Sequence, residues 1–231
     1  MYVASWSGGK DSCLAYYRAR QQGYQVGYLV NFISPEADQR VHFHGCLSGL
    51  IKAQAEAMGI PLLQPAVPEA SYEEFFKQTL RELLPESLEG MIFGDIYLEE
   101  HREWCRRVCA EVGIEAVHPI FGCSTSQVMA DFLEAGFEAV IISGRPDYFT
   151  GEQMGWKLSQ RFVEWCQSQE GMGICGESGE YHTVVVDGPS FRRRLVITES
   201  EPAEVNGHWF LDIRKWELAN KAERLYSEEE G

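Results

Sequence analysis

Six consecutive residues near the start of the chain combine small, charged and hydroxyl side chains: Ser7-Gly8-Gly9-Lys10-Asp11-Ser12. Two adjacent glycines let a backbone curl so that successive N–H groups converge on one anion. Lys10 adds a full positive charge, and Ser7 and Ser12 add hydroxyl donors. Hydrogen bonds to a charged group of this kind contribute about 1.5–3 kcal/mol each. This segment, residues 7–12, therefore predicts a phosphate-binding loop and is called the phosphate loop below.

Two aspartates are placed to assist such a loop. Asp11 lies within it, and Asp95 follows a short apolar run together with Gly94. Magnesium accompanies a bound triphosphate and prefers oxygen ligands such as carboxylates. We therefore expect Asp11 to be a Mg²⁺ ligand, and Gly94 and Asp95 to contact a nucleotide. The alternative for Asp95 is that it only begins the helix that follows.

The elements that must hold these residues alternate between strand and helix patterns. Apolar runs predict strands at 2–6, 26–32, 62–63, 91–93, 116–118 and 139–143, and helical spacing predicts helices at 13–22, 47–58, 72–84, 99–112 and 126–135. Such alternation implies right-handed crossovers and an α/β fold, with a mainly parallel sheet and helices on both faces. The phosphate loop then joins a strand to a helix, whose N-terminus adds about half a positive charge.

The pattern changes in the last third of the chain. It predicts a helix at 153–167, a glycine-rich stretch at 171–179, β-prone runs at 182–186 and 195–198, a hairpin at Asn206-Gly207, and a helix at 214–226. We therefore expect two domains. Residues 1–135 form the nucleotide-binding α/β domain, and residues 136–231 form a smaller α+β substrate domain at the carboxyl ends of the parallel strands.

The composition limits the kinds of partner. Acidic residues number 35 against 20 basic ones, and the net charge is −15. Such a surface repels phosphate backbones and anionic lipids, so neither DNA nor a membrane is an expected partner. No run approaches about 18 apolar residues, and no secretory signal pattern opens the chain. The seven cysteines include no Cys-x-x-Cys pair, which favours a reducing cytoplasm over a disulfide framework.

The phosphate loop resembles the PP-loop of ATP pyrophosphatases, Ser-Gly-Gly-x-Asp-Ser, and lacks the Walker A pattern. This resemblance implies a HUP-like (adenine nucleotide alpha hydrolase-like) fold and a site that grips the β- and γ-phosphates of ATP, so that pyrophosphate leaves. Enzymes of that superfamily adenylate a carboxylate or a similar oxygen, and a nitrogen or sulfur nucleophile then displaces AMP. The protein contributes mainly positioning and charge neutralisation to such a reaction.

Three further segments narrow the resemblance to one family. They are His42-Phe43-His44 ahead of 53–61, Gly94-Asp95-Ile96 followed by His101-Arg102, and 175–183 followed by 187–191. In this order they are similar to the diphthine–ammonia ligase family, the N-type ATP pyrophosphatases, in its short single-subunit form. The resemblance implies the last step of diphthamide synthesis, in which the carboxylate of diphthine on elongation factor 2 is adenylated and then amidated by ammonia. No glutaminase domain is expected, so ammonium would arrive free or from another protein.

With that resemblance the candidate residues fall into three groups. Expected catalytic residues are Lys10, Asp11, Glu177 and Glu180; expected ATP-binding residues are Ser7, Gly8, Gly9, Lys10, Asp11, Ser12, Asn31, Gly94 and Asp95; expected substrate-binding residues are His44, His101, Arg102, Gly176, Gly179, Tyr181, His182 and Thr183. The two glutamates are three residues apart in a glycine-rich turn. We expect them to face one cavity, where they could hold ammonium, accept its proton or pair with a cationic substrate.

Several alternatives stay open at this point. Glu177 and Glu180 could form a solvated turn, and Arg102 could make a surface ion pair with Glu99 or Glu103. Cys105 and Cys109 are expected to be small core residues. A different small carboxylate could replace diphthine, or the chain could be a non-catalytic nucleotide-binding module. A tRNA-modifying PP-loop enzyme is less favoured because the chain is strongly acidic. A homodimer is expected in solution.

Overall fold

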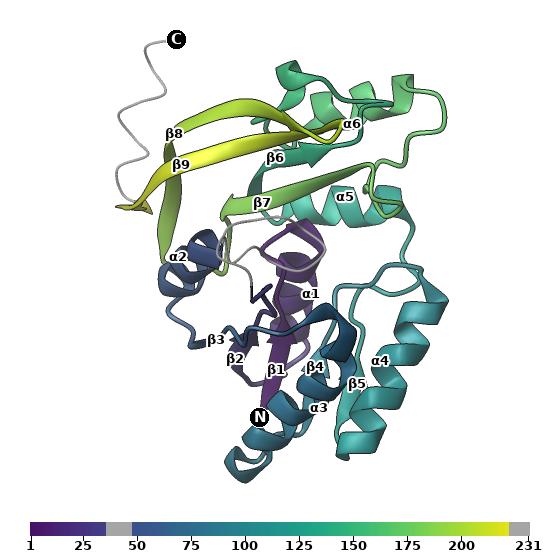
Figure 1. Ribbon diagram of the computed structural model, residues 1–231, viewed down its shortest axis with the longest axis vertical. Helices are drawn as coiled ribbons and strands as arrows, with labels where there is room; N and C mark the ends of the chain where they lie inside the picture. Colours follow the sequence, from purple (N-terminus) through teal and green to yellow (C-terminus); the bar gives the residue numbers. More distant parts are fainter. Residues whose placement is uncertain (36–47, 222–231) are drawn as a thin grey trace.

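The computed structural model describes residues 1–35 and 48–221 (Figure 1). Five strands form a parallel sheet in the order β3-β2-β1-β4-β5. Their bounds are β1 Tyr2–Ser5, β2 Val26–Val30, β3 Leu62–Leu63, β4 Gly90–Ile92 and β5 Glu115–Val117. The α/β fold with a parallel sheet is thereby confirmed. The strand order reverses between β1 and β4, and sheets of this kind bind ligands in the crevice at such a point.

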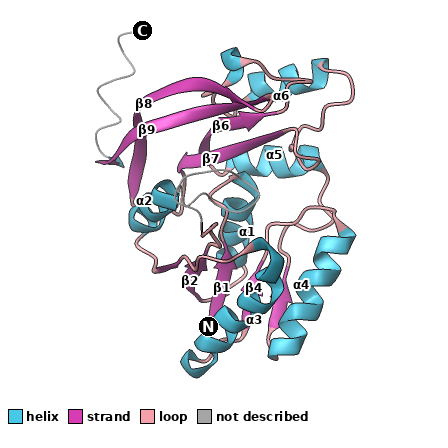
Figure 2. Ribbon diagram, viewed as in Figure 1, coloured by secondary structure: helices cyan, strands magenta, loops and turns pink. Residues whose placement is uncertain are grey.

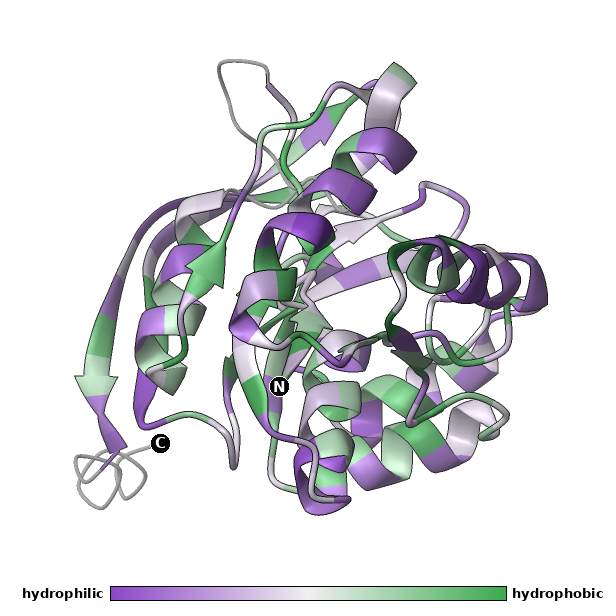
Figure 3. Ribbon diagram, turned by 90° about the horizontal axis from the view of Figure 1, so that it is seen from below, coloured by the Kyte–Doolittle hydropathy of each residue, from purple (hydrophilic) through white to green (hydrophobic). Residues whose placement is uncertain are grey.

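Helices cover both faces of the parallel sheet. Their bounds are α1 Lys10–Gln21, α2 Ser48–Met58, α3 Tyr72–Leu83, α4 Glu99–Val112 and α5 Thr125–Glu134, with 3₁₀ turns at Glu69–Ser71 and Leu84–Glu86. Neighbouring strand residues point to opposite faces. Val3 packs in one core with α3 and α4, whereas Ala4 packs in the other with α1, α2 and α5. Hydrophobic and hydrophilic stretches alternate along these helices in Figure 3, as expected for helices with one buried face.

A second, antiparallel sheet has the order β7-β6-β9-β8. Its strands are β6 Glu138–Gly144, β7 Tyr181–Asp187, β8 Arg193–Val205 and β9 His208–Asn220; the 3₁₀ turn Gly151–Gln153 and helix α6 Gln160–Ser168 lie between β6 and β7 in sequence (Figure 2). Asn206 and Gly207 both have positive φ, of 52° and 80°, as a two-residue hairpin turn requires. The predicted hairpin is confirmed.

Two predicted helices are wrong in whole or in part. Within 214–220 the chain is strand β9, which pairs with β8 along its length, for instance Trp216 with Ile197; residues 222–226 lie outside the described part. The predicted helix at 153–167 starts only at Gln160, because Lys157 bridges to Val140 and Ser159 caps the helix by accepting from the Phe162 N–H. In both places pairing with another strand outweighs local helix propensity.

The second sheet lies directly against the phosphate loop. The backbone N–H of Val185 in β7 donates to the carbonyl of Gly8 at 2.9 Å, and the N–H of Lys10 donates to the hydroxyl of Thr183 at 3.1 Å. These bonds join residues more than 170 positions apart, at the carboxyl end of β1 (Figure 1). The boundary between two domains at residue 135 stays a prediction. In the described part of the chain, every helix is too short or too polar for a bilayer span.

Candidate active site

A cavity of about 460 Å³ opens at the point where the parallel strand order reverses. Three segments line it: the phosphate loop after β1, residues 93–95 after β4, and residues 176–183 leading into β7. Its lining residues are Ser5, Ser7, Gly9, Lys10, Asp11, Ser12, Phe93, Gly94, Asp95, Leu98, His101, Gly176, Glu177, Gly179, Tyr181, His182 and Thr183. The structure thus brings together most of the residues that the sequence singled out.

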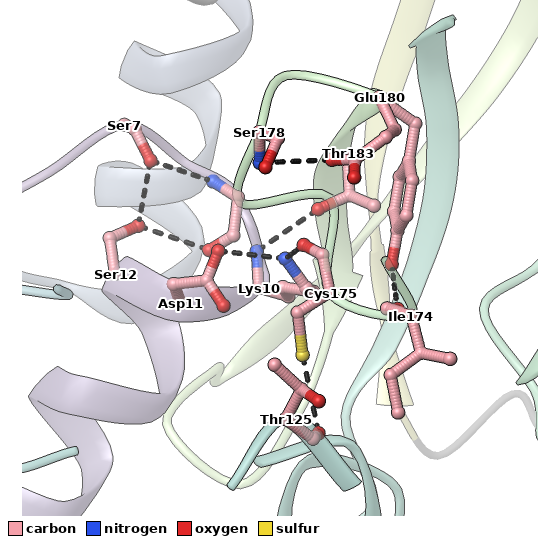
Figure 4. A network of polar contacts seen from close by, with 12 residues as sticks. Ser7, Lys10, Asp11, Ser12, Thr125, Ile174, Cys175, Ser178, Glu180 and Thr183 are labelled. Carbon is pink, nitrogen blue, oxygen red and sulfur yellow. Dashed lines mark hydrogen bonds and ion pairs between the residues drawn. The ribbon is translucent and has the colours of Figure 1, made fainter. Parts of the chain in front are cut away.

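The phosphate loop is held in one shape by close packing. Gly8 has φ of +79°, and a Cβ there would lie 2.4 Å from the Cδ1 of Ile51, so the position accepts only glycine. The hydroxyl of Ser12 donates to the carbonyl of Gly9 at 3.0 Å, and the Ser7 hydroxyl donates to the Ser12 hydroxyl at 3.2 Å (Figure 4). The loop and the first turn of α1 are therefore preorganised before any anion binds.

Gln54 in α2 is a positioning residue that the sequence analysis did not identify. Its side chain is fully buried behind the loop. The amide nitrogen donates to the carbonyls of Gly8 and Val185 at 2.9 and 2.7 Å, and the amide oxygen accepts from the indole of Trp6 at 3.0 Å. The available signal was a glutamine surrounded by alanines on a buried helix face. Gln54 links the loop, the first strand and the second sheet.

The Gln54→Leu variant should be markedly less stable than the wild-type protein. Leucine leaves the Trp6 N–H without its acceptor and removes one donor each from the carbonyls of Gly8 and Val185. An unsatisfied buried group costs about 1–3 kcal/mol, and each lost hydrogen bond adds to that. We expect the free energy of unfolding, measured by urea denaturation, to fall by about 3 kcal/mol or more. Gln78→Leu, at an exposed position of α3, is the control, with an expected change within about 0.5 kcal/mol. Equal effects of the two substitutions would contradict the role of Gln54.

Lys10 lies under the cavity with its side chain almost wholly buried. Its ammonium donates to the carbonyl of Cys175 and to Oδ2 of Asp11 at 2.8 Å, and it lies 5.4 Å from the centre of the Tyr181 ring (Figure 4). Burial by itself lowers the pKa of Lys10, but the charge and hydrogen bond of Asp11, together with Cys175 and Glu177, outweigh burial, and the pKa is raised. Lys10 therefore stays positively charged at neutral pH, in reach of an anion in the cavity.

Glu177 lines the same cavity from the opposite segment. Burial raises the pKa of its carboxyl to about 7, and the negative charges of Asp11 and Asp95 add to this effect, while Lys10 opposes it. A group that titrates near neutral pH can exchange a proton with a ligand at little cost. This is the property that a general base or a proton acceptor for ammonium needs.

Glu180 does not line the cavity, so the expectation that both glutamates face it is corrected. The side chain is buried, and one oxygen accepts from the backbone N–H of Gly173 at 3.1 Å. The other accepts from the backbone N–H of Ser178 at 2.9 Å (Figure 4). These bonds fold the glycine-rich segment back on itself. Glu180 thus positions the segment that carries Glu177, and a role as a catalytic residue does not fit its contacts.

The Glu180→Gln variant should lose stability and not the pH dependence of activity. The glutamine amide presents a donor where one backbone N–H needs an acceptor, at a cost of about 1–3 kcal/mol. We expect a lower urea midpoint and faster proteolysis within residues 171–180, while the pH at which activity rises stays near that of the wild type. Glu170→Gln, on an exposed side chain, is the control. A shifted pH profile without loss of stability would restore a direct role for Glu180.

Asp95 and His101 form a hydrogen-bonded pair at the cavity wall. The bond to Asp95 raises the pKa of His101. A second imidazole, His118 at the end of β5, has its Nε2 3.6 Å from Oδ2 of Asp95, and burial lowers the pKa of His118.

Arg102, which is expected to bind substrate, pairs with Glu99 at 2.6 Å and lies over the Phe121 ring. The ion pair that the sequence offered as the alternative is therefore present, and a contact of Arg102 with substrate stays a prediction.

Three further predicted positions are Asn31, His44 and His182. Asn31 was expected to bind ATP, but it is 2% exposed and lies outside the cavity lining. Its amide donates to the Trp6 carbonyl at 2.7 Å and accepts from Gln64 at 2.8 Å, so it fixes the end of β1. His44 lies outside the described residues. His182 does line the cavity, and burial lowers its pKa to about 4.

A parallel sheet with this strand order, a glycine-rich phosphate loop after its first strand and a cavity at the reversal point define a nucleotide-binding protein of the PP-loop class. Matches to protein-family models identify the family within this class. The model described as the diphthamide synthase N-terminal domain matches residues 1–116, and that of the diphthamide synthase C-terminal domain matches residues 124–219. The chain belongs to the diphthamide synthase family.

Curated relatives of the chain are named diphthine–ammonia ligases. A diphthine–ammonia ligase from Rattus norvegicus is 28% identical over 225 residues, covering 84% of this chain and 82% of that protein. The Mus musculus diphthine–ammonia ligase is 26% identical over 253 residues, covering 96% and 91%. A solved structure, described as a predicted subunit of tRNA methyltransferase from Methanocaldococcus jannaschii, is 16% identical over 82% of this chain and 98% of that chain, with a TM-score of 0.44.

Proposed function

We propose that this chain is an ATP-dependent ligase that forms a C–N bond, converting diphthine on elongation factor 2 into diphthamide. The reaction first joins the substrate carboxylate to the α-phosphate of ATP with release of pyrophosphate. Ammonia then attacks the acyl carbon, and AMP leaves. The observation that carries the proposal is the preorganised phosphate loop facing Glu177 across one cavity, in a chain of the diphthamide synthase family.

The adenylation step would depend on the charges around the phosphate loop. Gly9 and Ser12 line the cavity at the start of α1, where the helix N-terminus favours a negatively charged group. Lys10 would neutralise charge that develops on the departing pyrophosphate. Gly94 packs so closely on the first turn of α1 that a Cβ there would lie 3.0 Å from the Ser12 nitrogen. The end of β4 therefore supports the loop during the reaction.

Magnesium fits the carboxylate at the base of the cavity. Among the described residues, Oδ1 of Asp11 is buried and has no hydrogen-bond partner, although Oδ2 is bonded to Lys10. An unsatisfied carboxylate oxygen at the wall of a phosphate site suits a hard cation. Asp11 would hold Mg²⁺ directly or through water, and the ion would supply charge neutralisation for the triphosphate.

The amidation step would use Glu177. Its pKa of about 7 means that the carboxylate form is well populated slightly above neutral pH. That form can hold ammonium by charge and accept its proton, which leaves neutral ammonia to attack. His101 and Tyr181 line the space beside it and would orient the acceptor. The chain's own residues thus supply charge at one wall and a proton acceptor at the other.

Exchange of labelled pyrophosphate into ATP tests the proposal. The purified protein, ATP and Mg²⁺ are incubated with elongation factor 2 carrying diphthine, with elongation factor 2 lacking the modification, and with small carboxylates. We expect exchange, and amide formation with ammonium, only with the diphthine-bearing protein. Exchange with a small carboxylate alone would move the function to another substrate. Release of orthophosphate, or no exchange with any acceptor, would contradict the ligase reaction itself.

The proposal also covers the cellular location and the oligomeric state of the enzyme. A protein that modifies elongation factor 2 would act in the cytoplasm. The half-buried side chains of Trp209, Phe210 and Trp216 on the β8–β9 hairpin are available for a homodimer contact. Sedimentation velocity of the full chain should then give twice the monomer mass of 26.2 kDa. A monomer at micromolar concentration would contradict the homodimer and leave the ligase proposal unaffected.

A further inference from the structure

A cluster of unlike polar side chains lies behind the cavity wall, at the carboxyl ends of β4 and β5. One ligand atom each from Asp95, Cys105 and His118 lies within 4.8 Å of the other two. Asp95 follows β4, His118 follows β5, and Cys105 belongs to α4, so three elements converge on the cluster. The two strands are neighbours in the sheet, with Ile92 paired to Val117. Their ends are therefore held close together by the fold.

A fourth candidate ligand comes from the same helix. His101 precedes Cys105 by four residues, so both side chains lie on one face of α4. The Nδ1 of His101 is 4.0 Å from the Cys105 sulfur, and it is hydrogen-bonded to Asp95. Together the four residues offer one sulfur, two imidazole nitrogens and one carboxylate.

Two buried polar atoms of this cluster have no hydrogen-bond partner among the described residues. The His118 side chain is 6% exposed, and its Nε2 has no hydrogen-bond partner among the described residues. The same holds for Oδ2 of Asp95, which lies 3.6 Å from that nitrogen. Each such buried atom carries a cost of about 1–3 kcal/mol. The His118 ring stacks on Phe93, with 5.2 Å between ring centres. This stacking keeps the unpartnered Nε2 of His118 directed toward Asp95.

The distances suit a tetrahedral metal ion. Zinc binds carboxylate oxygen and imidazole nitrogen at about 2.0–2.2 Å and thiolate at about 2.3 Å, so its ligand atoms lie about 3.3–3.8 Å from one another. The separation between Asp95 and His118 falls in that range, and the Cys105 sulfur lies within 4.8 Å of both. His101 lies outside this group of three, so its ring must turn toward the other ligands to complete the set. A set that mixes thiolate, imidazole and carboxylate favours Zn²⁺, because Mg²⁺ prefers oxygen ligands alone.

We propose that Asp95, Cys105 and His118, with His101 as fourth ligand, bind one Zn²⁺ ion. On binding, the Cys105 thiol releases its proton to solvent, and the thiolate and the Asp95 carboxylate balance the charge of the ion. The ion ties the ends of β4 and β5 to α4. It thereby fixes Asp95 and His101, which line the nucleotide cavity. This site is separate from Mg²⁺ at Asp11, and it does not depend on the ligase reaction.

Metal binding by the full chain, without ATP, tests the site. After removal of metal with a chelator, the protein is titrated with Zn²⁺ against a chromophoric competitor and its metal content is measured by mass spectrometry. We expect one Zn²⁺ per chain that a large excess of Mg²⁺ does not displace. Cys105→Ser and His118→Asn should each weaken binding by at least about 100-fold. The matched control is Cys109→Ser, because Cys109 is equally buried one turn further along α4 but lies outside the cluster.

Cobalt substitution keeps the test decisive if a variant folds poorly. Co²⁺ bound by the wild-type protein should show a thiolate-to-metal absorption band in the near ultraviolet. The band should persist in Cys109→Ser and His118→Asn and disappear in Cys105→Ser. Less than stoichiometric Zn²⁺ in the wild type, absence of the band there, or equal Zn²⁺ affinity of Cys105→Ser and Cys109→Ser would each overturn the proposal. None of these readouts involves ligase activity, so the two proposals fail independently.

Discussion

Replacing Lys10 with methionine is expected to lower kcat/KM for pyrophosphate release by about 1,000-fold, the scale reported for removing a preorganised charge-stabilising group. The ammonium lies under the phosphate loop, and Asp11 keeps it charged at neutral pH. Because it sits in a buried, water-poor position, its charge acts on the phosphates more strongly than it would in solvent. Pyrophosphate exchange and nucleotide affinity by calorimetry measure the two parts of this effect separately.

Lys10→Met can lower activity by removing the charge of Lys10 or by destabilising the fold, and further variants separate these two effects. Lys10→Met leaves the buried carboxylate of Asp11 without its cation, which is itself destabilising. The double variant Lys10→Met/Asp11→Asn removes both charges together and should recover stability without recovering activity. Lys52→Met, on an exposed side chain of α2, is the control and should behave as the wild type. An active double variant would show that the loop does not act on phosphate through Lys10.

The parallel sheet could be predicted because its signals are local. Glycine ends α4 at Gly113, with φ of +88°, and the predicted bounds of that helix, Glu99–Val112, agree with the structure. The last strand could not be recognised in the same way. Its residues have acceptable helix propensity, and the alternation of Trp216 and Leu218 becomes meaningful only beside the partner strand β8.

In the candidate active site too, features encoded by adjacent residues could be predicted, whereas roles that depend on contacts between distant segments could not. The phosphate loop could be recognised from six residues, and the structure places it at the end of β1. The different roles of Glu177 and Glu180 could not be distinguished, because three residues of sequence separation do not show which carboxylate meets backbone N–H groups. Gln54 and His118 were missed for a similar reason. Their roles come from contacts with segments 46 and 23 residues away.

Replacing Glu177 with glutamine is expected to reduce amide formation by about 10²–10⁴-fold, the usual contribution of a positioned proton acceptor. Pyrophosphate exchange should fall much less, because the loop, Lys10 and Asp11 remain. The pH dependence is the sharper readout. Burial raises the pKa of Glu177 to about 7, above its usual range. The carboxylate is therefore protonated below that pH and charged above it, so wild-type amidation should rise with pH through about 7.

In Glu177→Gln this rise near neutral pH should be absent, because no titrating group replaces the carboxylate. Glu170→Gln, on an exposed glutamate of the preceding loop, should keep both the rate and the pH profile of the wild type. Asp11, Asp95 and Lys10 also influence the Glu177 carboxyl. Neutralising Asp11 should therefore move the midpoint of the profile to lower pH, since one negative neighbour is lost. If the rise survives unchanged in Glu177→Gln, another group accepts the proton and the assignment of Glu177 is wrong.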